Sequence, residues 1–235
     1  MTREPTRSEI TDYLDPAYFQ AQAYGSTSMH YRDQMRNILS LIQPFDGKRV
    51  LDIGSGSGKI VALMADTAKP IALDFSPLSV AMAQETIEKQ GHAKHASVVQ
   101  ARGEVLPIRS NSFDMVTALD FVEHINTEEY DVLLHEVYRV LKSGGVFCIY
   151  TPNKSYFLEY IYKLMYGRSY HPQHFGLKTV KELIKPLEAA NYRIEHLSTQ
   201  PNYLPVLRQF EQVFKHLPLI GDLAKRRVSI RAVKI

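Results

Sequence analysis

The sequence predicts a doubly wound α/β sheet in one domain, mostly parallel with an antiparallel last strand. Apolar segments that fit buried parallel strands alternate with helix-like segments from residue 48 to 151, and parallel strands need such crossovers. The first apolar run, 49–53, ends in a glycine-rich turn and leads into a helix. Near the end of the chain, Arg227–Lys234 alternates in polarity, which predicts the antiparallel strand.

The other elements follow from the same patterns. Further strands are predicted at 70–74, 97–100, 113–119, 146–151 and 192–198. Ser76 and Pro77 suit the start of a helix that Gly91 ends. Thr127 can cap the helix before the fifth strand. The inner face of this helix is expected to hold Val132, Leu133, Val137, Val140 and Leu141. Later helices are predicted at 155–168, 179–190 and 206–217.

The composition is ordinary for a soluble globular protein. The chain has 235 residues, of which 45% are hydrophobic and 23% charged. Its net charge of +3 is too small to argue for nucleic acid as a partner. A single cysteine, Cys148, rules out an intrachain disulfide and is expected to be buried and inert. Without a signal-peptide pattern or an apolar run of ~18 residues, we expect a cytoplasmic protein.

The stretch from Val50 to Gly58 reads V-L-D-I-G-S-G-S-G and predicts a ligand-binding turn. Glycines at alternate positions permit a tight turn and let the backbone approach a ligand closely. The dinucleotide fingerprint has the different spacing G-x-G-x-x-G. Asp52 stands two residues before the first glycine, where it would repel a pyrophosphate and suit a cationic ligand. Asp74 ends the second strand, where a carboxylate can accept both ribose hydroxyls.

These residues resemble the first motifs of class I S-adenosylmethionine (SAM) methyltransferases, including the type 11 group. The resemblance covers residues 48–151 well and the rest loosely. It implies a Rossmann-like, seven-stranded sheet and SAM as the cofactor. Arg102 departs from the family, which has an acid there for the adenine, so Gly103 or Glu104 would take that contact. The implied cofactor-binding residues are Asp52, Gly54, Ser55, Gly56, Gly58, Asp74, Phe75, Gly103, Glu104 and Asp120.

A second cluster follows the fourth strand. On a turn of helix, Asp120, Glu123 and His124 would share one face, and two carboxylates with an imidazole can hold a divalent cation. A later histidine, His171 or His174, would complete the set, and we favour His174 because His-Phe leads into the next helix. Without a metal, His124 and His174 could act as general bases. They could also simply hydrogen-bond within the wall of the site.

This spacing resembles two methyltransferase branches that use a divalent metal such as Mg. These are the O-methyltransferases of ubiquinone biosynthesis and the small-RNA 2′-O-methyltransferases. The resemblance implies methyl transfer to an oxygen of a small-molecule or lipid-like acceptor. The alternatives are nitrogen, carbon or RNA 2′-OH acceptors, a nucleotide-dependent oxidoreductase, and a non-catalytic binding protein with this fold. Nucleic acid is a less favoured partner, because there is no dense basic stripe.

The flanking regions would shape the acceptor pocket. Residues 1–46 form an aromatic arm that either folds over the ligands or packs on the sheet. Residues 152–190 form a lid or insertion, and its aromatic helix at 155–168 either covers the pocket or makes peripheral membrane contact. The basic run at 225–227 would reinforce such contact or simply be a solvated turn.

Overall fold

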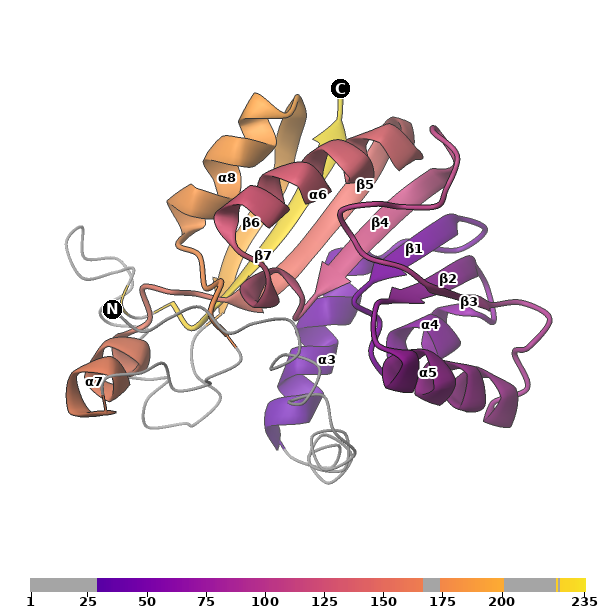
Figure 1. Cartoon of the computed structure of the whole chain (residues 1–235), viewed down its shortest axis with the longest axis horizontal. Helices are drawn as coiled ribbons and strands as arrows, with labels where there is room; N and C mark the ends of the chain where they lie inside the picture. The colour runs from indigo at the N-terminus through magenta and orange to yellow at the C-terminus, as the bar shows by residue number, and fades with distance from the viewer. Residues whose placement is uncertain (1–28, 167–173, 201–222, 224) are drawn as a thin grey trace.

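A computed structural model describes residues 29–166, 174–200, 223 and 225–235. These residues form one seven-stranded sheet in the order β3-β2-β1-β4-β5-β7-β6 (Figure 1). Neighbouring strands from β3 to β5 are parallel, whereas β7 is antiparallel to both β5 and β6. The predicted fold class is therefore confirmed. The strands are β1 Arg49–Ile53, β2 Lys69–Asp74, β3 Ser97–Gln100, β4 Phe113–Leu119, β5 Leu141–Pro152, β6 Tyr192–Gln200 and β7 Arg227–Lys234.

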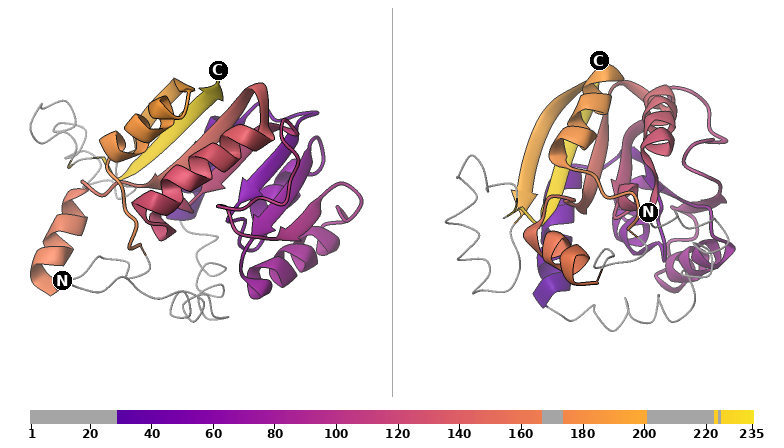
Figure 2. Two further views of the ribbon diagram at one scale, coloured as in Figure 1. Left: turned by 45° about the horizontal axis from the view of Figure 1, so that its top comes forward. Right: turned by 60° about the vertical axis from the view of Figure 1, so that its left-hand side comes forward.

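Helices cover both faces of this sheet (Figures 1 and 2). Alternate side chains of β1 enter different cores: Leu51 and Ile53 pack with α6 (Thr127–Val140) and α8 (Val180–Ala189), whereas Val50 packs with α3 (Met29–Ile42). That alternation is the period of two expected of a strand buried on both faces. The helices are α3 Met29–Ile42, α4 Lys59–Met64, α5 Pro77–Lys89, α6 Thr127–Val140, α7 Phe157–Tyr166 and α8 Val180–Ala189, with a 3₁₀ turn, η2, at Val122–His124.

Three local predictions need correction. The cap of α6 is Asn126 rather than Thr127, because the Asn126 side chain accepts from the Glu129 amide while the Glu129 side chain accepts from the Asn126 amide. Val132 is 46% exposed, and Tyr130 and Leu134 take the inner face with Leu133, Val137 and Val140. Strand β5 begins at Leu141, directly after α6, rather than at Val146.

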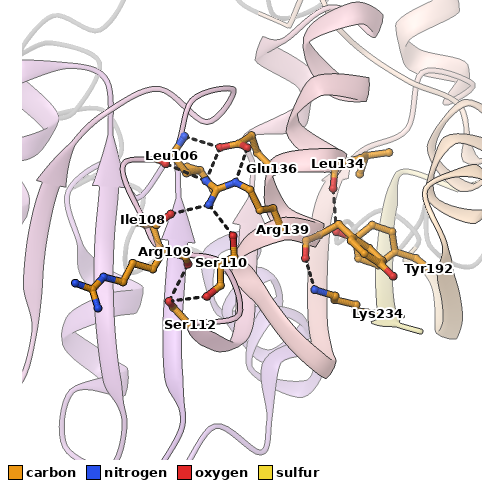
Figure 3. A network of polar contacts seen from close by, with 11 residues as sticks. Leu106, Ile108, Arg109, Ser110, Ser112, Leu134, Glu136, Arg139, Tyr192 and Lys234 are labelled. Carbon is orange, nitrogen blue, oxygen red and sulfur yellow. Dashed lines mark hydrogen bonds and ion pairs between the residues drawn. The ribbon is translucent and has the colours of Figure 1, made fainter.

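A polar network fastens the chain entering β4 to α6, as Figure 3 shows. Arg139 donates to the carbonyl oxygens of Leu106, at 3.0 Å, and Ile108, at 2.7 Å, and it is paired with Glu136. Glu136 in turn accepts from the Leu106 amide at 2.9 Å. This network holds the segment before β4 against α6.

Helix α7 lies apart from the sheet at one end of the molecule (Figures 1 and 2). Three of its apolar side chains are exposed, Ile161 at 46%, Leu164 at 86% and Met165 at 65%. The aromatic arm before residue 29, His171 and the predicted helix at 206–217 lie outside the described residues. Among the described helices, none combines the length and the apolar character needed to span a membrane.

Candidate active site

The glycine turn after β1 forms one part of the site, which we call the cofactor corner (residues 52–58 and 74–76). Gly54, Gly56 and Gly58 all have positive φ, at 71°, 52° and 73°. The amides of Gly54 and Ser55 donate to the Leu73 carbonyl at 2.8 and 3.1 Å, which ties the turn to β2. A Cβ on Gly58 would lie 2.9 Å from Ala83 of α5. The turn therefore needs glycine for both its backbone conformation and its packing.

Asp74 closes the corner from β2. Its Oδ2 accepts from the Gly56 amide and its Oδ1 from the Ser76 amide, each at 3.0 Å. Burial raises the pKa of this carboxyl, and the bonds from Ser76 and Gly56 oppose that rise. The Ser79 side chain and the Phe75 backbone also hydrogen-bond to this carboxyl and oppose the rise.

Asp52 lies behind the turn and is only 3% exposed. Thr117 of β4 donates its hydroxyl to Asp52 Oδ1 at 2.6 Å. Burial raises the pKa of Asp52 to about 7; the Thr117 bond opposes this, and the charge of Asp74 adds to it. A buried carboxyl with a pKa near neutrality responds strongly to a cation placed beside it.

The ring of Phe121 covers the corner. A Cβ on Gly54 would overlap Phe121, and a Cβ on Gly103 would lie 3.3 Å from Phe121 Cζ. Phe121 thus packs against two predicted cofactor residues from different loops. Its only sequence signal was its place directly after Asp120 at the end of β4. Phe75, by contrast, is 38% exposed at the end of β2.

Glu104 is held by its neighbour. Arg102 donates from Nε to Glu104 Oε2 at 3.2 Å and from Nη2 to Oε1. The two carboxylate oxygens of Glu104 are therefore already engaged. An adenine contact by Glu104 or by the backbone of Gly103 stays a prediction.

The second part of the site follows β4, and we call it the acceptor cluster (Asp120, Glu123, His124, His174 and Arg227). Asp120 has a φ of 53°, so it is not helical, and η2 begins only at Val122. The expected single helical face for Asp120, Glu123 and His124 is therefore wrong. The Asp120 carboxylate instead accepts from Gln34 of α3 and forms an ion pair with Arg227 of β7.

Glu123 is 1% exposed. Its Oε2 accepts from the Thr151 hydroxyl at 2.9 Å, and its Oε1 has no hydrogen-bond partner among the described residues. Burial raises the pKa of Glu123 to about 8; the charge of Asp120 adds to the rise, and that of Arg227 opposes it. A buried oxygen with unused bonding capacity suits a proton, a cation or a ligand hydroxyl.

His124 and His174 face each other edge to face, with ring centroids 5.1 Å apart and planes at 79°. Ligand atoms of Glu123, His124 and His174 all lie within 4.8 Å of one another. Two imidazole nitrogens and a carboxylate oxygen are a donor set that divalent cations accept. The structure thus brings together three of the four predicted metal ligands, while the Asp120 carboxylate is paired with Arg227.

Sequence reasoning missed several residues that build the acceptor cluster. Gln34 and Arg227 hold Asp120, Thr151 holds Glu123, and Lys178 binds backbone carbonyls beneath His124. Arg227 is 107 residues from Asp120 along the chain. The one signal that could have drawn attention to it was a charged side chain at the start of a strand in which polar and apolar residues alternate.

Comparison with known proteins adds sequence relatives. A family model described as a methyltransferase domain matches residues 51–149. A ubiquinone/menaquinone biosynthesis C-methyltransferase, UbiE, of Allorhizobium ampelinum is 34% identical over 103 residues, which are 42% of this chain and 39% of that protein. A demethylmenaquinone methyltransferase of Bacteroides fragilis is 28% identical over 140 residues, 58% of this chain and 56% of that protein. The chain thus spans only part of these curated relatives.

Solved structures share the fold. The [4+2]-cyclase SpnF gives a TM-score of 0.72 at 19% identity and covers 100% of this chain and 98% of its own. Phosphoethanolamine N-methyltransferase 2 of Haemonchus contortus, solved with SAM, gives 0.71 at 20% identity, covering 96% of this chain and 60% of its own. Residues 51–149 thus match a methyltransferase domain, and the chain shares its fold with these solved structures.

Proposed function

We propose that this chain transfers the methyl group of SAM to a small, largely apolar acceptor that carries an ionisable hydroxyl group. The observation that carries the proposal is the cofactor corner, where the glycine turn meets Asp52 and Asp74. Asp74 lies at the end of β2, where a carboxylate can accept from ribose hydroxyls, and Asp52 lies where a cationic amino-acid group would favour its ionised form. When bound, SAM supplies a methyl group already activated by its sulfonium.

The protein's own part in such a reaction is alignment and proton removal. The base that takes the proton of the acceptor hydroxyl would come from the titratable groups clustered beyond β4. These groups are Glu123, His124 and His174. The unpartnered Glu123 Oε1 and the buried Arg227 Nε, which has no hydrogen-bond partner among the described residues, would favour an oxygen-bearing group there.

The methylated atom is proposed to be carbon. The sequence pattern led us to expect oxygen, but one relative is named a ubiquinone/menaquinone biosynthesis C-methyltransferase and another a demethylmenaquinone methyltransferase, and neither name supports oxygen. Deprotonating a ring hydroxyl makes the adjacent ring carbon nucleophilic, so the same base serves either atom. A quinol-like ring is therefore the acceptor class that we propose.

A metal remains part of the proposal. The unused Glu123 Oε1 and the two imidazoles fit a divalent cation, which would lower the pKa of a coordinated acceptor hydroxyl. Undiminished turnover after exhaustive EDTA treatment would show that the reaction needs no metal. Undiminished turnover in both His124→Ala and His174→Ala would show that neither histidine acts as the base.

Helix α7 would bring a lipid-like acceptor to the site. Its exposed Ile161, Leu164 and Met165 could lie at a membrane surface. Co-flotation with anionic phosphatidylglycerol vesicles tests this, and Leu164→Ser with Met165→Ser should abolish it. Flotation that persists in this double variant would reject α7 as the contact.

The central test is calorimetry with SAM and S-adenosylhomocysteine, followed by turnover of a demethylmenaquinol analogue with ¹³C-methyl SAM. We expect binding of both ligands and a carbon-bound label in the product NMR spectrum. A methoxy signal would show that the methyl group is transferred to oxygen instead of carbon. The absence of binding to folded protein at millimolar ligand would reject the function.

A further inference from the structure

Lys178 is a buried cation outside the residues assigned above to chemistry. It is 4% exposed, and its ammonium group donates to three backbone carbonyls: Val122 at 3.0 Å, Ile125 at 2.7 Å and Gly176 at 2.8 Å. All three ammonium hydrogens are thereby used. The ring of Tyr130 lies 5.2 Å from the ammonium nitrogen.

These carbonyls belong to two separate segments. Val122 and Ile125 bracket Glu123 and His124 on the short turn η2, whereas Gly176 follows His174 by two residues. A three-residue turn leaves most of its carbonyls without helical partners, so they need donors from elsewhere. One ammonium group therefore joins the segment that carries His124 to the segment that carries His174.

Gly176 strengthens the same junction. Its amide donates to the Glu123 carbonyl at 2.9 Å, and a Cβ at this position would overlap the Ile125 carbonyl. The Lys154 amide donates to the Lys178 carbonyl at 3.1 Å, which ties the segment to the chain just after β5. The two segments are thus in direct backbone contact, and a larger residue than glycine would separate them.

Burying an ammonium group is costly unless it is hydrogen-bonded. A methionine would fill much of the same volume without that cost, so packing alone does not explain a lysine here. What the lysine adds is a charged donor to three carbonyls, and such bonds are stronger than neutral ones.

We infer that Lys178, with Gly176, is a positioning residue that holds His174 against His124 and Glu123. It does not touch the acceptor; it fixes the distance between the groups that would. The inference rests on the proposed function only for its consequence in catalysis, because the contact between the two rings is a property of the protein without ligands.

The test is NMR of protein with ¹³C-labelled histidine rings, assigned with His124→Gln and His174→Gln. The wild type should show a cross-relaxation signal between the two rings and a ring-current shift of one of them. Lys178→Met and Gly176→Ala should each lose both features. Lys154→Met, a change at a surface lysine paired with Glu182, should keep them.

Binding of S-adenosylhomocysteine, measured on the same samples, separates the outcomes. Its retention in Lys178→Met, together with the lost ring signal, supports positioning. An unchanged ring signal in the folded variant overturns the inference, and so does failure of both variants to fold. Failure of the wild type to bind the ligand rejects the proposed function but leaves the ring measurement intact.

Discussion

The cofactor corner and the acceptor cluster occupy the same edge of the sheet but are built differently. In the corner, backbone amides of Gly56 and Ser76 satisfy Asp74, and the residues involved are close in sequence. In the cluster, Asp120 depends on Arg227 and Gln34, which are 107 and 86 residues away. The corner is therefore mainly a backbone turn that holds Asp74 beside Asp52, whereas the cluster is a set of charged groups that the tertiary fold must bring together.

The largest expected effect concerns the buried charges. Arg227→Gln leaves Asp120, whose side chain is 31% exposed, without its ion-pair partner; the loss in the free energy of unfolding should approach but not exceed the about 3–5 kcal/mol of a fully buried pair. Denaturant titration measures this loss. Adding Asp120→Asn should recover part of it, whereas Lys142→Gln, which breaks the surface pair with Asp114, should cost about 1 kcal/mol or less. If Arg227→Gln and Lys142→Gln lower the free energy of unfolding equally, the Asp120–Arg227 pair of the acceptor cluster contributes no more than a surface pair, and the expectation is wrong.

The next effect concerns the corner. Asp74→Ala removes the acceptor of two backbone amides and the proposed ribose contacts, and each bond to a charged group contributes about 1.5–3 kcal/mol. We expect calorimetry to show SAM binding weakened by about 100-fold. Asp66→Ala, an exposed acid beside His92, is the matched control and should bind normally. Normal SAM binding by Asp74→Ala would show that the ribose is bound by other residues.

A smaller effect concerns pH. The pKa of Asp52 is raised from 3.8 to about 7, so the folded state keeps its proton across a range in which the unfolded state has lost it. The free energy of unfolding should therefore fall between pH 3.8 and 7 and then level off. If the ionised form favours a cationic ligand, SAM should bind about tenfold more tightly at pH 8 than at pH 6.

Asp52→Asn should abolish both pH trends. The ionisation of SAM itself affects binding to the wild type and to Asp52→Asn equally. The difference between their pH profiles of binding therefore reports the ionisation of Asp52. A binding profile shared by both proteins would show that Asp52 does not sense the ligand's charge.

The smallest effect concerns Arg102. Arg102→Ala removes the hydrogen bonds that Arg102 donates to the Glu104 carboxylate, but the ion pair is partly exposed, and such pairs contribute about 1 kcal/mol or less. We expect the dissociation constant for SAM, from calorimetry, to change less than about fivefold. A much larger gain in affinity would identify Glu104 as an adenine contact that Arg102 suppresses.

Much of the corner could be predicted from the sequence. The bounds of β1, β4 and β7 match the predicted segments, because apolar runs and alternation reflect burial of each strand's own residues. The capping of α5 by Ser76 also followed from local chemistry. The α6 cap failed because Asn126 and Thr127 are adjacent capping residues, and only the bond from the Glu129 amide distinguishes them.

The sequence by itself determined the α/β alternation, the glycine turn and the acid at the end of β2, since each depends on interactions within a short segment. Only the tertiary structure decided that Asp120 takes a left-handed conformation and pairs with Arg227, and that Lys178 joins the segments of His124 and His174. Buried charges are stable only with partners that satisfy them, and those partners come from wherever the fold places a strand or loop beside them. No local pattern in the chain records that choice.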